Sequence, residues 1–327
     1  MGVVSGSPLV ATLSAAIVSF TPDHYSALTA LWNQAYPDLR RTELELRLAD
    51  LATAPVGPRR WLAQRQGTVV GFASYEDLEG ELFRPHTYQL HLFVSPENRR
   101  QGIGARLYEQ VISDMKLLEP ELVRCWVLQV NEDSVRFLGR RGFSEEMRTF
   151  HSSLDTGQFD LKRLERYVGR LEKYGYEFRT FVDLAADPER NRKTYEVYRE
   201  VMNDIPSPEP PQLPSLAEYE ERIAKSPEFF RAQFIALHQG EYVGLCILLP
   251  KGRDRRELYA DTLGVTRSFR GRGIAQALSY SGIDFAKRNG YMRISADSFV
   301  ENRKILSLLE NLGFADARVW TLFAKSF

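Results

Sequence analysis

The chain has 327 residues, 43% of them hydrophobic and 26% charged, which is enough for two domains that each bury a core. Its 43 Lys and Arg residues balance 43 Asp and Glu residues, whereas proteins that bind nucleic acid or anionic membranes are usually basic. The composition therefore predicts no nucleic-acid or membrane partner. Cys125 and Cys246 lie in apolar runs without metal-ligand spacing, so we expect buried free thiols in a cytoplasmic protein with no metal site.

The N-terminal half of the chain reads as one α/β module at 15–155, after a loose tail at 1–14. The tail has no basic residue, so we expect that it is not a secretion signal. Apolar residues recur about every 3.6 residues in the expected helices and alternate in the expected strands. In chain order we expect a strand at 16–20, helices at 22–36 and 44–51, a hairpin of 61–64 and 69–75, a strand at 87–94, a helix at 104–118, a strand at 122–130 and a helix at 133–141.

The C-terminal half repeats this order as a second module at 177–327, after an amphipathic connecting helix at 156–176. Its expected elements, in chain order, are a strand at 178–184, a helix at 192–202, a hairpin of 234–237 and 242–245, a strand at 259–265, a helix at 275–289, a strand at 293–298 and a helix at 304–311.

A proline-rich stretch at 204–214 interrupts the second module. Proline excludes a helix or a central strand there, so we expect a loop. The loop is either the rim or lid of a substrate pocket or a plain linker, and the sequence leaves both interpretations open.

A motif of arginines and glycines occurs once in each module. Residues 99–104 read Arg-Arg-Gln-Gly-Ile-Gly, and residues 270–275 read Arg-Gly-Arg-Gly-Ile-Ala, with Gly102 and Gly273 171 positions apart. The same spacing relates the later pairs Asn131 and Asn302, Gly142 and Gly313, and Phe143 and Phe314. This common register indicates a duplicated module.

Each motif lies where a strand becomes a helix, which favours binding of a pyrophosphate. The first N–H groups of a helix have no partner within it, the helix dipole adds positive charge, and glycine lets an anion come close. The spacing is neither that of a dinucleotide fold nor that of a P-loop. The alternative is a helix start whose arginines lie on a solvated face.

On the basis of the two arginine–glycine motifs and the later Asn and Gly-Phe residues, the chain resembles the GNAT acetyltransferase superfamily over 16–150 and 177–327. In that family Arg/Gln-x-x-Gly-x-Gly/Ala follows a strand that ends in Val and holds the pyrophosphate of acetyl-CoA. The resemblance implies an α/β fold of two tandem GNAT-like domains, each a mixed, splayed sheet of six to seven strands flanked by helices. In layout the chain is similar to tandem members such as mycothiol synthase.

The resemblance also implies that acetyl-CoA is the cofactor of both modules. The residues that it implies for cofactor binding are Phe93, Val94, Arg99, Arg100, Gln101, Gly102, Ile103, Gly104 and Asn131 in the first module, and Leu263, Gly264, Val265, Arg270, Gly271, Arg272, Gly273, Ile274, Ala275 and Asn302 in the second.

By the same resemblance an amine attacks the thioester directly, and the motif strand is the place to look for the base. His91 occupies this place in the first module and Asp261 in the second. Histidine suits proton transfer near neutral pH, whereas aspartate needs a raised pKa or a relaying water. Each can instead be an ordinary strand residue. Asp297, Glu76 and Asp77 are further carboxylates without an assigned place.

Many members of the family carry a Tyr four residues before Gly-Phe as the general acid, but Leu138 and Leu309 stand here. Two interpretations follow. The first is an acetyl-CoA-dependent N-acetyltransferase that acts on a primary amine of a small molecule, as a monomer or homodimer. The second is an acyl-CoA-binding regulatory or structural module in which one or both copies are non-catalytic.

Overall fold

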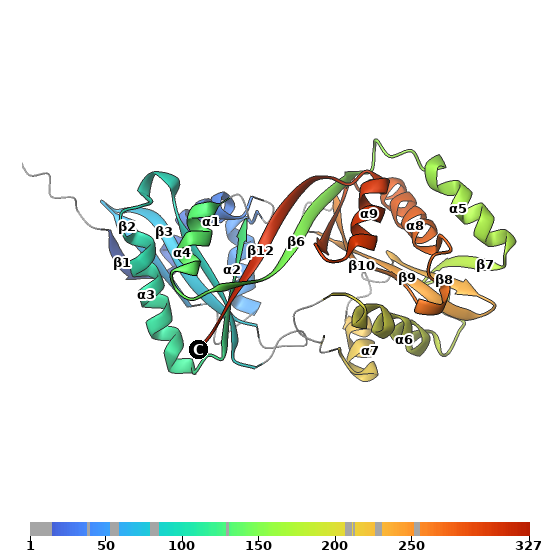
Figure 1. Ribbon diagram of the computed structural model, residues 1–327, viewed down its shortest axis with the longest axis horizontal. Helices are drawn as coiled ribbons and strands as arrows, with labels where there is room; N and C mark the ends of the chain where they lie inside the picture. The colour runs from blue at the N-terminus through green and yellow to red at the C-terminus, as the bar shows by residue number, and fades with distance from the viewer. Residues whose placement is uncertain are drawn as a thin grey trace, which may run out of the picture. The chain divides into compact units, whose positions relative to one another are not determined.

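The computed structural model describes residues 15–37, 40–52, 59–78, 85–128, 131–206, 211, 213–225, 231–251 and 256–327. The expected tail at 1–14 and residues 207–210 and 212 of the proline-rich stretch lie outside this part of the chain. The described residues form two compact units, whose elements are labelled in Figure 1. Unit 1 contains residues up to 78, 85–126 and Ala324–Phe327, and unit 2 contains the described residues of Val127–Phe323.

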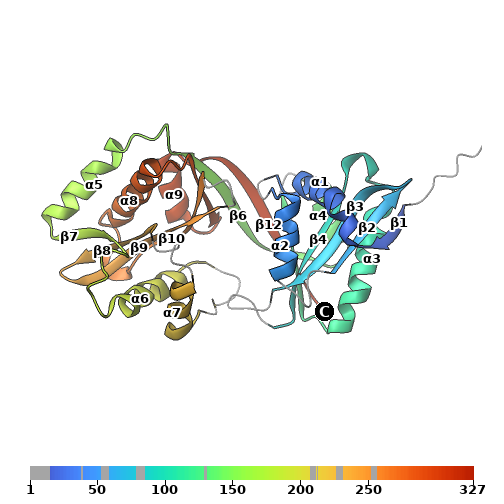
Figure 2. The same cartoon turned by 180° about the vertical axis from the view of Figure 1, so that it is seen from behind.

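Unit 1 is a mixed sheet with helices on both faces. Its elements are β1 (Ala16–Ser19), α1 (Tyr25–Ala35), α2 (Glu43–Ala52), β2 (Arg59–Arg65), β3 (Thr68–Asp77), β4 (Thr87–Val94), α3 (Ile103–Met115), β5 (Leu122–Leu128) and the end of β12 (Ala315–Ser326). The strand order is β1-β2-β3-β4-β5-β12, and β4 runs parallel to β5. Trp32 of α1 stacks on Phe72, whereas Leu107 of α3 lies against Gly71. Neighbouring strand residues point to opposite faces, so α1 and α3 cover opposite faces (Figure 2).

Unit 2 has the same plan. Its elements are α4 (Glu132–Gly139), β6 (Ser144–Asp155), α5 (Lys162–Lys173), β7 (Tyr176–Thr180), α6 (Arg190–Asn203), α7 (Leu216–Lys225), β8 (Gln233–His238), β9 (Glu241–Pro250), β10 (Glu257–Val265), α8 (Ile274–Arg288), β11 (Arg293–Phe299), α9 (Arg303–Leu312) and most of β12. The strand order is β12-β6-β11-β10-β9-β8-β7. Leu278 of α8 lies against Gly244, and Val201 of α6 shares a core cluster with Leu245, so these helices cover opposite faces.

Each unit contains a strand segment that belongs, by sequence, to the other repeat. Strand β6 ends the first repeat but pairs antiparallel with β11, from Thr149↔Phe299 to Asp155↔Arg293. Conversely, Ala324–Phe327 ends the second repeat but belongs to unit 1, where Phe327 N donates to Glu121 O at 3.2 Å.

The predicted α/β fold of two tandem domains built on mixed sheet is confirmed, with local differences. The strand expected at 178–184 ends at Thr180, because Thr180 N donates to Asp183 Oδ2 (3.0 Å) and Asp183 N donates to Thr180 Oγ1 (3.1 Å), which closes a turn. The sequence analysis predicts neither the strands β6 and β12 nor the helix α7. In β6, buried and exposed positions do not alternate over most of its length.

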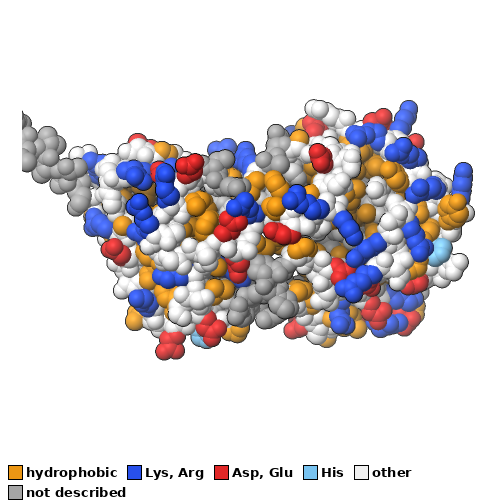
Figure 3. Space-filling model, in the orientation of Figure 1, with side chains coloured by type: hydrophobic (Ala, Val, Ile, Leu, Met, Phe, Trp, Pro, Cys, Tyr) orange, Lys and Arg blue, Asp and Glu red, His pale blue; other side chains and the backbone are white. Residues whose placement is uncertain are grey.

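The surface is mixed in charge. Acidic and basic side chains are interspersed over the face shown in Figure 3, in keeping with the zero net charge. Both cysteines are buried and free, as predicted, and burial raises the pKa of each thiol to about 12. Within the described ranges, no helix combines the length and apolar character needed to cross a membrane.

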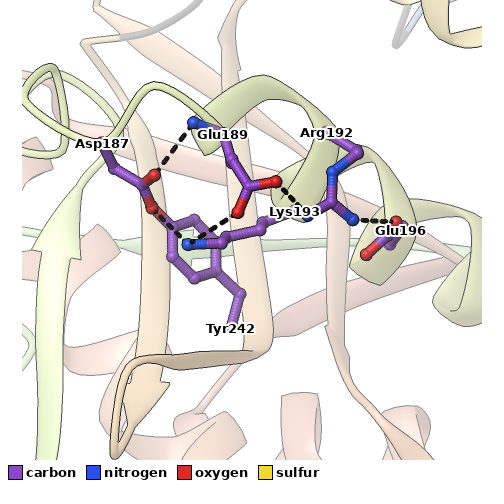
Figure 4. A network of polar contacts seen from close by, with 6 residues as sticks. All are labelled: Asp187, Glu189, Arg192, Lys193, Glu196 and Tyr242. Atoms are coloured by element: carbon purple, nitrogen blue, oxygen red, sulfur yellow. Dashed lines mark hydrogen bonds and ion pairs between the residues drawn. The ribbon is translucent and has the colours of Figure 1, made fainter.

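Helix α6 is fastened to the sheet at its N-terminal end (Figure 4). Lys193 Nζ lies 2.8 Å from Asp187 Oδ2, which also accepts a hydrogen bond from the Tyr242 hydroxyl of β9 at 3.0 Å. The hydrogen bond from Lys193 lowers the pKa of Asp187, and burial raises the pKa of Tyr242. The network continues through the exposed ion pairs of Arg192 with Glu189 and Glu196.

The other half of α6 packs so closely on β10 that only glycine fits beneath it. A Cβ on Gly264 would lie 2.2 Å from Val201 Cγ1.

Gly264→Ala is therefore expected to destabilise the protein by about 1–3 kcal/mol, since it overpacks this contact. Adding Val201→Ala removes the clashing methyl groups and should recover part of the loss, measured as free energies of urea unfolding. Gly169→Ala in α5 is the control, because its Cβ would meet nothing within 4 Å and alanine favours helix. Equal stability of Gly264→Ala and Gly169→Ala would contradict this packing.

Candidate functional site

In each unit the motif strand parts from its parallel neighbour before the motif begins. The β4–β5 pairing covers Thr87–Gln89 against Leu122–Arg124, and from Leu90 onward β4 continues beside β3. The β10–β11 pairing covers Glu257–Ala260 against Arg293–Ala296. Past these points an extended ligand can pair with the motif strand in place of the parallel neighbour.

The arginine that opens each motif is fixed to the end of its strand. Arg99 Nε donates to Val94 O at 2.9 Å, and Arg270 Nε donates to Val265 O at 2.8 Å. The predicted duplication therefore extends to the same hydrogen bond in both loops. In each loop the arginine side chain ties the loop to the last residue of the motif strand.

Gly102 and Gly273 form the N-caps of α3 and α8, with φ of 78° and 92°. These left-handed values favour glycine. A Cβ at Gly102 would meet nothing within 4 Å, whereas one at Gly273 would lie 2.8 Å from Arg170 Nη2 and 3.0 Å from Tyr167 Cδ1. The unit 1 loop is thus open at this glycine, and α5 covers the equivalent position in unit 2.

Other motif side chains also contact protein groups. Gln101 Oε1 accepts a hydrogen bond from Arg65 at 2.7 Å, and Arg272 donates to the Tyr176 hydroxyl at 3.0 Å. The Arg99 guanidinium lies over the ring of Phe93 at 5.5 Å.

The two later asparagines begin helices. Asn131 Oδ1 accepts from Ser134 N at 3.2 Å at the start of α4, and Asn302 Oδ1 accepts from Ile305 N at 3.4 Å at the start of α9. Leu138 and Leu309 are buried in these helices, 3% and 7% exposed, so each contributes to apolar packing.

Helix α5 adds positive charge beside the unit 2 loop, which the sequence analysis missed. Arg170 Nη2 donates to Arg272 O at 2.7 Å. A cavity of about 490 Å³ is lined here by Arg170, Leu171, Tyr174, Tyr176, His238, Gly271 and Arg272. The available signal was the placement of Arg166, Arg170 and Lys173 on one face of the predicted connecting helix.

His91 lies between a phenol and a carboxylate. Its Nδ1 is 2.9 Å from the Tyr36 hydroxyl, and its Nε2 is 3.1 Å from Glu76 Oε1. The Trp32 ring packs against the imidazole, with centroids 5.3 Å apart. The hydrogen bond with His91 lowers the pKa of Glu76, and burial raises the pKa of Tyr36. The two hydrogen bonds, one at each ring nitrogen, fix the orientation of the His91 imidazole.

Asp261 is the extra residue of a β-bulge. Ala260 pairs with Leu248 and Thr262 with Ile247, so Asp261 is left without an opposite residue. Bulges re-aim side chains and are common beside active sites. Asp261 is exposed, yet partial desolvation of its carboxylate raises its pKa, while the Thr262 hydroxyl donates to Oδ2 at 2.9 Å.

Asp204 joins the end of α6 to the unit 2 loop. Its carboxylate forms ion pairs with Arg267 and Arg270, and Arg267 N donates to Glu200 Oε1 at 2.6 Å. The hydrogen bond from Arg267 is the main cause that lowers the pKa of Asp204 to about 2. The proline-rich stretch, whose first residue is Asp204, therefore starts beside this loop. That the stretch is the rim or lid of a pocket, or a plain linker, stays a prediction.

Asp204→Asn is expected to lower stability near neutral pH and to have little effect in strong acid. A carboxyl whose pKa falls on folding, here from 3.8 to about 2, stabilises the fold above the unfolded value. That contribution is lost as the pH falls through about 2. The difference in unfolding free energy between wild type and variant should therefore be largest above about pH 4 and shrink toward pH 2.

The control for this measurement is Asp284→Asn, which removes an exposed pair with Arg288 on α8 and should change stability little. A wild-type advantage over Asp204→Asn that stays constant with pH would contradict the ion-pair assignment.

Known proteins resemble this chain in sequence and in fold. The model of the acetyltransferase (GNAT) family matches residues 23–143 and 192–314. The chain is 32% identical to N-alpha-acetyltransferase 30 of Schizosaccharomyces pombe over 91 residues. This aligned segment covers 27% of this chain and 58% of that protein.

Two solved structures resemble the chain over nearly its whole length. The GCN5-related N-acetyltransferase from Sphaerobacter thermophilus has a TM-score of 0.72 at 17% identity, over 95% of both chains. A tandem GNAT protein from the clavulanic acid biosynthesis pathway has a TM-score of 0.66 at 16% identity, over 95% of this chain and 98% of that one. At these identities the likeness concerns the fold.

Proposed function

The chain belongs to the acetyltransferase (GNAT) family, and from this premise we propose that it is an acetyl-CoA-dependent N-acetyltransferase. The acceptor that we propose is a primary amine of a small molecule, which attacks the thioester directly. The observation that best supports the proposal is that both units contain the same strand–loop–helix structure. In each, an arginine (Arg99 or Arg270) is hydrogen-bonded to the end of the motif strand, and a glycine with a left-handed φ begins the helix.

Both loops suit the pyrophosphate of acetyl-CoA. The first N–H groups of α3 and α8 have no partner within the helix and carry partial positive charge. The space beside Gly102 and Gly271 can accept phosphate oxygens, because a Cβ at either glycine would meet nothing within 4 Å. Bound there, acetyl-CoA supplies the thioester, and the parted motif strand can pair with its extended arm.

We propose His91 and Asp261 as the groups that handle the acceptor amine. The contacts of His91 with Tyr36 and Glu76 hold its imidazole in a fixed orientation on the motif strand. The raised pKa of Asp261 brings a carboxylate closer to the range of a general base, and it can also hold an ammonium group.

The second candidate function is acyl-CoA binding without turnover in one or both units. It is favoured by buried Leu138 and Leu309 at the positions where many family members carry an acid, and by Tyr167 and Arg170 over the unit 2 loop. A unit of this kind would bind acyl-CoA and release no thiol.

Gly102→Val is expected to abolish acetyl-CoA binding in unit 1 only, and Gly273→Val is expected to abolish it in unit 2 only. A β-branched residue at a left-handed φ strains the N-cap and displaces the first N–H groups. Calorimetry should show that each variant loses one of the two wild-type sites. Gly67→Val and Gly290→Val are controls with φ of 77° and 75° away from the N-caps, and should keep both sites. Unchanged two-site binding by both motif variants would refute the loop assignment.

His91→Ala and Asp261→Ala are expected to lower kcat/KM on the order of 10²-fold in the unit that turns over, because each removes an acid–base group. The measurement is thiol release from acetyl-CoA over a panel of primary amines between about pH 6 and 9. His86→Ala and Asp23→Ala serve as exposed controls of the same residue types. An unchanged pH–rate profile in both variants would show that neither residue takes part.

A further inference from the structure

A histidine from the first repeat lies beside the parting strands of unit 2. Because β6 pairs with β11, His151 stands opposite Asp297 in the register. His151 Nδ1 is 2.7 Å from Asp297 Oδ1. Their side chains are 15% and 40% exposed, so the pair can be reached from solvent.

Asp297 and Asp261 flank the point where β10 and β11 separate. The last pair of these strands is Ala260↔Ala296, so Asp297 is the first residue of β11 beyond it and Asp261 is the bulged residue of β10. Burial, together with the nearby charges of Asp297 and Asp261, raises the pKa of Tyr259. The contacts bring β6, β10 and β11 together at one place.

Unit 1 has a different set of side chains at the equivalent point. There the last pair is Gln89↔Arg124, followed by the buried residue Leu90 on β4 and the buried thiol of Cys125 on β5. The register of β4 with β3 runs without a bulge from Gly71↔Val94 to Asp77↔Tyr88. The acid–base pair is therefore a property of unit 2.

We propose that His151 accepts the proton of the acceptor amine in unit 2 and that Asp297 is its positioning residue, an inference that rests on the proposed N-acetyltransferase function. A neutral imidazole that donates Nδ1–H to Asp297 presents the lone pair of Nε2 as a base. In the described part of the chain, no hydrogen bond to Nε2 is found. Histidine is matched to this transfer near neutral pH.

The proton balance of the step is simple. The acceptor ammonium, held by Asp261, gives one proton to His151 Nε2. The freed nitrogen lone pair forms the C–N bond to the thioester carbonyl carbon, the C–S bond breaks, and sulfur leaves with the bonding electrons. The second proton of the nitrogen passes through solvent to the thiolate, and His151 returns its proton to solvent.

The test compares His151→Gln and Asp297→Asn with wild type in thiol release from acetyl-CoA over the panel of primary amines. We expect each variant to lower kcat/KM on the order of 10²-fold, with KM for acetyl-CoA unchanged within about twofold. Because the two residues act as a unit, the double variant should lose little more than either single one.

The controls are His86→Gln in unit 1 and Asp284→Asn in unit 2, which should keep wild-type rates. A second measurement needs no variant to fold: the imidazole ¹⁵N spectrum of the wild-type protein should show neutral His151 protonated at Nδ1. An Nε2–H tautomer, or variants that match the controls, would overturn the role of His151 while the enzyme stayed active. Absence of transfer by wild type to any primary amine would instead remove the proposed function and this inference with it.

Discussion

The N–H and C=O groups along a strand edge need partners, and the pairing of β6 with β11 meets this need in unit 2. Strand β6, at the end of the first repeat, belongs to unit 2, whereas Ala324–Phe327, at the end of the second repeat, belongs to unit 1. The residues of one unit are therefore not all present in one repeat. The same pairing brings His151 beside Asp297 of β11, so this side-chain pair of unit 2 draws on both halves of the sequence.

The two loops keep one backbone design and differ in what surrounds it. Arg99 and Arg270 make the same hydrogen bond to the end of the motif strand. Around this shared core, unit 1 leaves Gly102 open, while α5 places Arg170 and Tyr167 over Gly273. The binding of an anion by backbone N–H groups tolerates such variation, because the donors are present whatever the neighbouring side chains are. Two loops of one origin can in this way differ in affinity or in turnover.

Helix α6 is held at both ends, which matters for the geometry of unit 2. Asp187 and Lys193 attach its start near β9, and Asp204 attaches its end to the unit 2 loop. Between these points Val201 packs against Gly264 of the motif strand. An acceptor bound beside α6 would meet a strand whose position relative to the loop is fixed, and such rigid support favours reactions that depend on orientation.

Local spacing in the sequence determined the duplicated α/β fold, the place of both loops and the need for glycine at positions 102 and 273, because these depend on residues close together in the chain. Only the tertiary structure decided that His91 lies between Tyr36 and Glu76, that Arg170 reaches Arg272, and that His151 meets Asp297. The last two pairs are separated by 102 and 146 residues. Contacts over such distances follow from the order in which strands join the sheet and helices pack on it, which residue spacing along the chain does not specify.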